Sequence, residues 1–105
     1  MNALFICSRN KWRSKTAEEI FQKKEGVAVR SAGTSSVARI KVNEKLIDWA
    51  DLIFVMENHH KQWLNRNYSD SLTGKKLVVL DIPDEYHYMD EELIQMLELA
   101  TKPYW

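Results

Sequence analysis

The sequence is poor in cysteine, the residue whose disulfide bonds stabilise many small secreted proteins: only one of its 105 residues is a cysteine. A lone cysteine cannot form an internal disulfide, which excludes a disulfide framework. Without companion cysteines or a close cluster of cysteine and histidine, a structural zinc site is not expected either. Cys7 is therefore either a small apolar residue at the end of a buried strand or a reactive thiol.

Long apolar runs are also missing. No stretch approaches the roughly 20 apolar residues of a transmembrane helix, and the segment MNALFICSRN has neither the basic start nor the long apolar centre of a signal peptide. We therefore expect a cytoplasmic protein that does not bind membranes and is built as one domain over residues 1–105.

The sequence has no net charge, because 15 basic residues balance 15 acidic ones, and this gives no support for nucleic-acid binding. The charges are nevertheless unevenly distributed. Residues 1–50 contain ten Lys or Arg against five Asp or Glu, and residues 51–105 contain five against ten. The N-terminal half is therefore suited to an anion, and four of its basic residues lie within residues 9–15.

Short apolar runs alternate with amphipathic segments along the chain. Runs of strand length occupy residues 3–7, 27–29, 52–56 and 77–80. Helical patterns occupy residues 14–24, 42–50, 58–66 and 90–100, and breaks fall at Gly26, Gly33, residues 67–71 and Gly74. This order predicts a single-domain, doubly wound α/β fold in which a four-stranded parallel sheet has helices on both faces.

Polar residues follow three of the expected strands. Such sheets bind ligands beyond the carboxyl ends of their strands. Cys7 ends the first strand, and Asp81 and Asp84 follow the fourth, so we expect all three at the same edge of the sheet. His59 and His60 follow the third strand at the start of a helix, where we expect them to be exposed and neutral.

The segment CSRNKWRS (7–14) has the composition of an anion-binding loop between a strand and a helix. Its backbone N–H groups can curl around an anion at the N-terminus of a helix, a setting that also favours a thiolate at Cys7. Arg13 presents a planar fork that suits two oxygens of a phosphate. Ser14 can cap the helix or donate to the thiolate, and Asn10 tolerates a left-handed turn.

CSRNKWRS, RSAGTS (30–35) and VLDIPDEYHY (79–88) together resemble three motifs of the low-molecular-weight protein tyrosine phosphatases, in particular the short bacterial members. The likeness covers nearly the whole chain in the same order. It implies a low-molecular-weight phosphatase domain over residues 1–105 with a flavodoxin-like, phosphotyrosine protein phosphatase I-like fold. It also implies hydrolysis of phosphomonoesters through a phosphocysteine intermediate, with no metal and no cofactor.

The resemblance assigns roles to the residues of the loop. Cys7 matches the nucleophile, Arg13 the phosphate clamp and Ser14 the hydroxyl that stabilises the thiolate. Asn10 and Ser31 match a hydrogen-bonded pair that supports the loop. The other residues expected to bind phosphate or support the loop are Ser8, Arg9, Lys11 and Trp12.

The general acid is expected in DIPDEYHY. The family commonly has an aspartate followed by proline and two aromatic residues, often preceded by Asp-x-Pro, and this larger pattern, aligned on DIPDEYHY, places Asp84 at the acid. Asp81 is the alternative acid, although its position closer to the strand end also suits a capping or turn residue. A general acid must reach the departing oxygen by a hydrogen bond. Glu85 is read as a solvated loop charge.

Aromatic and basic residues near the loop bear on the substrate. Tyr86 matches an aromatic residue that flanks the substrate ring, and Trp12 either faces it across the pocket or packs against a neighbouring helix. Arg9, Lys11 and Lys15 suit a substrate with extra negative charge. The expected partners are therefore a phosphorylated protein or small aryl phosphate, with inorganic phosphate or another oxyanion in the loop.

The sequence also departs from the family pattern. Arg9 stands where a glycine is usual, Trp12 replaces a second cysteine, Lys15 and Glu85 replace prolines, and the stretch between Gly33 and Asp51 is short. Glycine adopts positive φ easily and arginine does not, so Arg9 is a possible source of strain. Two alternatives follow: an arsenate reductase that relies on an external thiol, and a non-catalytic module that binds phosphate or phosphopeptides.

Overall fold

The computed structural model describes all 105 residues and alternates strands with helices. The strands are β1 (Asn2–Cys7), β2 (Ala28–Gly33), β3 (Leu52–Val55) and β4 (Lys76–Val79). The helices are α1 (Arg13–Phe21), α2 (Glu44–Trp49), α3 (Asn58–Leu72) and α4 (Glu91–Thr101), followed by a 3-10 turn, η1 (Lys102–Tyr104). The strands form one parallel sheet in the order β2-β1-β3-β4, which confirms the predicted fold class.

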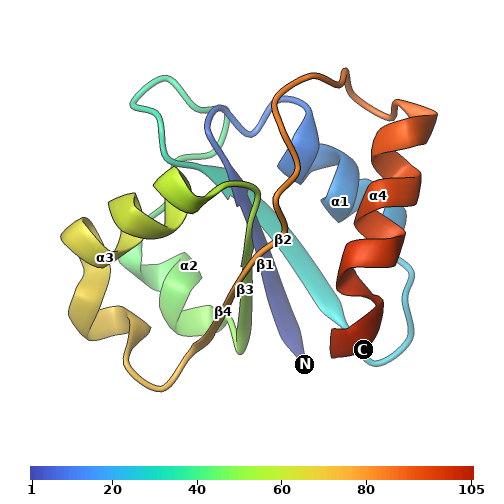
Figure 1. Ribbon diagram of the computed structural model, residues 1–105. Helices are drawn as coiled ribbons and strands as arrows, with labels where there is room; N and C mark the ends of the chain where they lie inside the picture. Colours follow the sequence, from blue (N-terminus) through green and yellow to red (C-terminus); the bar gives the residue numbers. More distant parts are fainter.

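The sheet lies between two layers of helices, with α1 and α4 on one face and α2 and α3 on the other (Figure 1). Strand β1 is at the centre and is buried on both sides. Ala3, Phe5 and Cys7 point into the core under α1 and α4, while Leu4 and Ile6 point into the core under α2 and α3. This alternation is the two-residue period of a strand, and it explains why the run is apolar throughout.

Two elements begin or end away from their expected positions. α1 begins at Arg13 and has no side-chain cap, because its N-cap residue is Trp12, whose indole cannot accept a hydrogen bond. Ser14, the expected cap, lies inside the helix with its hydroxyl 2.9 Å from the Cys7 sulfur. α3 continues to Leu72 through the expected break at 67–71, where only Tyr68 leaves helical angles (φ −140°, ψ 33°). The break is therefore a kink in one helix.

No helix has both the length and the apolar content needed to cross a membrane.

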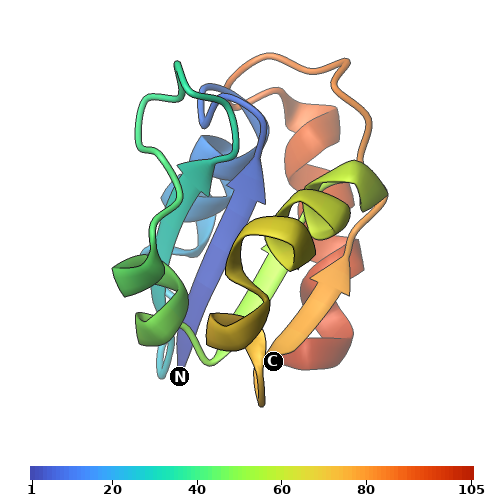
Figure 2. The same cartoon turned by 90° about the vertical axis from the view of Figure 1, so that its left-hand side faces the viewer.

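The carboxyl ends of the four strands lie along one edge of the sheet, and their loops gather there (Figure 2). The loop after β1 lies beside the segment 34–41 that follows β2. Gly33 makes this close approach possible, because a Cβ atom there would lie 2.5 Å from the carbonyl oxygen of Ser8 and 2.7 Å from the Cβ of Ala38. The fold thus brings the predicted functional segments to one edge.

Candidate active site

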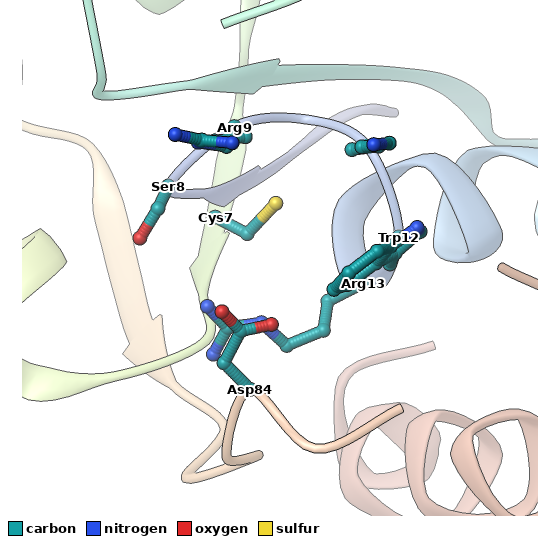
Figure 3. A pocket seen from close by; sticks show the side chains of 7 residues that line it. Cys7, Ser8, Arg9, Trp12, Arg13 and Asp84 are labelled. Atoms are coloured by element: carbon teal, nitrogen blue, oxygen red, sulfur yellow. The ribbon is translucent and has the colours of Figure 1, made fainter. Parts of the chain in front are cut away.

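A cavity of about 170 Å³ opens at this edge, between the loop after β1 and the segment after β4 (Figure 3). The residues that line it are Cys7, Ser8, Arg9, Lys11, Trp12, Arg13 and Asp84. Six of the seven belong to the predicted anion-binding loop, and the seventh is the predicted acid. The structure therefore brings together two segments that are far apart in the sequence.

The Cys7 sulfur points into the curve of the loop, although the residue is 3% exposed (Figure 3). The backbone N–H of Asn10 donates to Sγ at 3.3 Å, and the hydroxyl of Ser14 lies 2.9 Å from it. Ser14 Oγ also accepts a hydrogen bond from Asn10 Nδ2 at 2.7 Å, and its own proton has two acceptors within reach, the sulfur and, at the longer distance of 3.4 Å, the Ala32 carbonyl. The Asn10 N–H and the Ser14 hydroxyl thus converge on Sγ and fix the position of the sulfur within the loop.

The loop backbone is turned so that its carbonyl groups face away from the cavity. The carbonyls of Cys7, Ser8 and Arg9 accept hydrogen bonds of 3.0, 2.8 and 3.0 Å from the backbone N–H groups of segment 34–39. Because a trans peptide points its N–H opposite to its carbonyl, the N–H groups that follow these carbonyls face the cavity. This orientation is the one that an anion-binding loop requires.

The strain expected at Arg9 is absent. The left-handed residue of the loop is Asn10, with φ of 55°, whereas Arg9 has no positive φ. Asparagine tolerates this conformation, so the loop keeps its curve without the glycine that is usual in the family. The Arg39 side chain also donates to the Asn10 carbonyl at 3.1 Å.

Arg13 is buried, with only 2% of its side chain exposed. One end of its guanidinium is fixed, because Nη1 donates to Glu57 Oε1 at 2.5 Å and to the carbonyl of Ile82 at 2.8 Å. Nε lies 3.7 Å from Asp84 Oδ1. Nη2 has no hydrogen-bond partner within the protein, and Arg13 is one of the residues that line the cavity.

Glu57 was not singled out from the sequence. It follows β3 and therefore reaches the same edge, which was the available signal. Burial raises the pKa of its carboxyl, but the hydrogen bond and charge of Arg13, with a smaller effect of His59, outweigh burial and hold this pKa below its ordinary value. Glu57 is therefore a carboxylate that balances the buried guanidinium.

His60 is fully buried, so its expected exposure is wrong, although His59 is exposed as expected. Nδ1 of His60 accepts the backbone N–H of Glu57 at 3.0 Å, and Nε2 lies 2.9 Å from Ser8 Oγ. Burial, together with the charges of His59 and Arg13, lowers the pKa of His60 to about 3 and keeps the ring neutral.

Glu57, His59 and His60 each bring a potential metal-ligand atom within 4.8 Å of the others. The Glu57 carboxylate is already bonded to Arg13, however, and both ring nitrogens of His60 are hydrogen-bonded. The cluster is therefore arranged to support the loop.

The expected pairing of Asn10 with Ser31 is not formed. The Ser31 hydroxyl donates to Glu18 Oε1 of α1 at 2.7 Å, and the Asn10 amide donates to Ser14. A carboxylate is a stronger acceptor than an amide oxygen, which explains the choice of Ser31. Because the Ser31 hydroxyl bonds to Glu18, Asn10 Oδ1 is buried without a hydrogen-bond partner. Ser31 thus anchors α1 to the sheet and does not touch the loop.

The two candidate acids occupy different places. Asp84 lines the cavity beside Arg13, with 56% of its side chain exposed (Figure 3). Asp81 is exposed, has φ of 56° in the turn after β4, and does not line the cavity. Its conformation is that of a turn residue, and the geometry favours Asp84 as the group that meets a ligand.

Only one of the two expected aromatic walls is present. Trp12 lines the cavity, but Tyr86 packs against the apolar core under α1 and α4. The ring beside Trp12 is that of His87, at a centroid distance of 5.0 Å in an edge-on arrangement. The Lys11 ammonium lies 5.3 Å from the Trp12 ring centroid. The cavity rim is therefore less aromatic than the sequence indicated, and of the three expected basic residues Arg9 and Lys11 line it, whereas the Lys15 ammonium lies over the Tyr88 ring.

No family model and no curated protein sequence matches the chain. Solved structures match it along almost its whole length. The tyrosine phosphatase Wzb from Escherichia coli K30, in complex with sulphate, has a TM-score of 0.78 and 23% identity, over 98% of this chain and 94% of that one.

Two further solved structures illustrate the range of activities among the matches. SP-PTP, a low molecular weight protein tyrosine phosphatase from Streptococcus pyogenes, has a TM-score of 0.78 and 16% identity, over 98% of this chain and 89% of that one. The YwlE arginine phosphatase from Geobacillus stearothermophilus has a TM-score of 0.73 and 20% identity, over 97% and 92%. The chain therefore has the fold of the low-molecular-weight protein tyrosine phosphatases.

Proposed function

We propose that this chain is a cysteine-dependent phosphomonoester hydrolase of the protein tyrosine phosphatase type, which acts through a phosphocysteine. The observation that carries the proposal is the convergence of three groups on one cavity: the Cys7 sulfur with its two donors, the buried Arg13 guanidinium, and the Asp84 carboxyl. A solved structure similar to this chain, of a YwlE variant, carries a phosphorylated active-site serine, which supports a covalent intermediate at the corresponding place.

In the first step the substrate phosphoryl group occupies the cavity. The inward N–H groups of the loop and the free edge of Arg13 bind its non-bridging oxygens. The Cys7 thiolate attacks phosphorus in line with the ester oxygen, so that an S–P bond forms while the P–O bond breaks. Asp84, protonated at this stage, gives its proton to the leaving oxygen.

In the second step water attacks the phosphocysteine. Asp84, now a carboxylate, accepts a proton from the water, while the S–P bond breaks and returns the electron pair to the Cys7 sulfur. Inorganic phosphate then leaves. One carboxyl thus serves both steps, and its exposure at the cavity mouth gives it access to leaving group and water.

The charges of the cavity bear on the substrate. Arg9, Lys11 and Arg13 line it together with a single carboxylate, that of Asp84. This excess of positive charge suits a phosphate dianion on a neutral or acidic carrier and opposes the cationic guanidinium of phosphoarginine. We therefore favour phosphotyrosine in a protein, or a small aryl phosphate, as substrate.

A lone thiol that must stay reduced suits the cytoplasm.

Hydrolysis of p-nitrophenyl phosphate tests the proposal. We expect wild-type turnover without added metal, and we expect Cys7→Ser to abolish it while still binding inorganic phosphate, measured by calorimetry. Cys7→Ser with wild-type turnover would contradict the proposal. Phosphate binding without any hydrolysis by the wild type would identify a non-catalytic binding module instead.

A further inference from the structure

We propose that the N-terminus of α3 is a positioning device for the phosphate loop, in which His60 holds the start of the loop through Ser8 and Glu57 holds its end through Arg13. The inference rests on the proposed phosphatase activity and adds two positioning residues to it. Neither residue lines the cavity, so both act through residues that do.

The hydrogen bonds of His60 determine where its ring proton lies. Nδ1 accepts the backbone N–H of Glu57 and therefore carries no proton. In the neutral ring the proton is then on Nε2, which donates to Ser8 Oγ at 2.9 Å. Because burial keeps the ring neutral, this direction of the hydrogen bond is fixed over the ordinary pH range.

Ser8 transmits this contact to the loop. It directly follows Cys7, and its carbonyl is held from the other side by the backbone N–H of Ser35 at 2.8 Å. The side chain and the main chain of Ser8 are thus both fixed. The peptide that follows Ser8 is thereby held with its N–H toward the cavity, where an oxyanion would accept from it.

Glu57 performs the corresponding task at the other end of the loop. Its carboxylate fixes Arg13 Nη1, which leaves the rest of the fork oriented toward the cavity. Glu57 and His60 are also bonded to each other twice, because the Glu57 carbonyl accepts the backbone N–H of His60 at 3.0 Å and the His60 ring accepts the backbone N–H of Glu57 at 3.0 Å. The two ends of the loop are therefore held by the first turn of α3.

A role in capping α3 alone would give the same contacts between Glu57 and His60, so the test must separate capping from the contact with Ser8. The amide nitrogen of glutamine reaches about as far as His Nε2, and the amide oxygen of asparagine lies about where His Nδ1 does. His60→Gln therefore keeps the donor to Ser8 and loses the cap. His60→Asn keeps the cap and loses the donor.

We expect His60→Asn to lower kcat/KM for p-nitrophenyl phosphate by about tenfold, the equivalent of one hydrogen bond of about 1.4 kcal/mol, and His60→Gln to stay within about threefold of wild type. Ser8→Ala should match His60→Asn, and the double variant should lose no more than either alone. Gln62→Asn, at an exposed position of the same helix that makes no side-chain hydrogen bond or ion pair, is the matched control and should behave as wild type.

Glu57 is tested by a second pair of variants. Glu57→Gln keeps an oxygen for Arg13 and should lose less kcat/KM than Glu57→Ala, which removes both the oxygen and the charge. Equal losses in this pair would overturn the assignment of Glu57 as a positioning residue for Arg13.

The affinity for inorganic phosphate, measured by calorimetry, decides the inference about His60 even without turnover. The expected order is wild type and His60→Gln together, with His60→Asn about tenfold weaker. If His60→Gln instead binds phosphate more weakly than His60→Asn, in the same order as the free energies of unfolding of the two variants, His60 acts only as a cap of α3. That result would overturn the inference. If the wild type does not hydrolyse the substrate but the phosphate affinities have the expected order, only the proposed reaction is rejected.

Discussion

The two walls of the cavity are built in opposite ways. The loop from Cys7 to Arg13 is bonded on its outer side to segment 34–39 and to the N-terminus of α3, and its arginine is 2% exposed. The facing wall is an arch over residues 83–88 that carries Asp84, whose side chain is 56% exposed and whose polar contact is the 3.7 Å approach to Arg13.

The arch is hydrogen-bonded to the rest of the fold at its two ends, and between them Tyr86 packs against the core. The backbone N–H of Ile82 donates to the carbonyl of Met56 at 2.9 Å, and the backbone N–H of Met89 donates to the hydroxyl of Thr16 at 2.9 Å. The difference between the walls indicates that they have different roles. The loop is organised before the anion binds and determines the affinity for phosphate, whereas the arch supplies a proton and has little effect on that affinity.

The largest effect is expected from the fixed wall, at Arg13. Arg13→Lys keeps the charge but removes the planar fork, so that the Glu57 carboxylate and a bound phosphate can no longer be held together. We therefore expect kcat/KM to fall by about 10²–10³ and phosphate affinity to fall with it. A lysine variant within about fivefold of wild type in both quantities would remove the distinction between the walls.

The open wall should show the opposite pattern at Asp84. We expect Asp84→Asn to lower kcat/KM for phenyl phosphate by about 10²–10⁴, and that for p-nitrophenyl phosphate much less, because the nitrophenolate needs less help from a proton. Phosphate affinity should stay near the wild-type value. Asp81→Asn is the matched control and should leave both substrates nearly unaffected, so equal effects of the two changes would refute the assignment of the acid.

Gly33 tests how far the rigidity of the loop depends on the segment behind it. Gly33→Ala places a methyl group against the Ser8 carbonyl, and we expect a loss of about 1–3 kcal/mol in unfolding free energy together with weaker phosphate binding. Gly26→Ala is a control, because Gly26 has φ of 80° but open space around it. It should lose stability with unchanged phosphate affinity, and the same loss of affinity in both variants would contradict the account.

The buried His60 predicts a pH dependence of stability. Its folded-state pKa of about 3 lies below the unfolded value of about 6.5, so as pH falls the unfolded chain takes up the proton first. The contribution of His60 is complete above about pH 6.5 and is lost toward about pH 3, at about 1.4 kcal/mol per pH unit.

His60→Gln removes this titration, although Glu57, His59 and Arg13 still face the position. Urea unfolding at several values of pH should therefore give a steeper acid loss in the wild type than in the variant. Parallel curves for the two proteins would show that His60 is not buried as a neutral ring.

The smallest effect on simple substrates is expected at Arg9. Because this residue has no positive φ, Arg9→Gly should stay within about threefold of wild type on p-nitrophenyl phosphate. It should nevertheless reduce the preference for phosphotyrosine peptides with acidic neighbours over those with basic neighbours, a difference that added salt should also reduce. An unchanged preference would remove Arg9 from substrate selection.

Much of this architecture could be predicted from the sequence, because it depends on local patterns. The alternation of apolar runs with amphipathic segments gave the parallel sheet, and the segment from Cys7 to Ser14 gave the loop. The supports of the loop could not be predicted in this way. Glu57 and His60 meet Arg13 and Ser8 across separations of 44 and 52 residues, and no periodicity links them.

The errors lie where irregular backbone decides which way a side chain points. Tyr86 and His87 are adjacent in the arch, and only the path of the chain turns the histidine toward Trp12. Ser31 was assigned to the loop, but Glu18, one α-helical turn beyond Ser14, offers it a charged acceptor. A strand or helix period predicts facing residues, whereas a loop has no such period.

The central claim is that the Cys7 sulfur becomes covalently bound to phosphorus, and trapping that bond tests it most directly. In Asp84→Asn the hydrolysis of the intermediate lacks its base, so p-nitrophenyl phosphate should release a burst of nitrophenolate. Quenched protein analysed by mass spectrometry should then carry one phosphoryl group on the peptide that contains Cys7. Continued turnover with no burst and no phosphoryl group on that peptide would contradict the account.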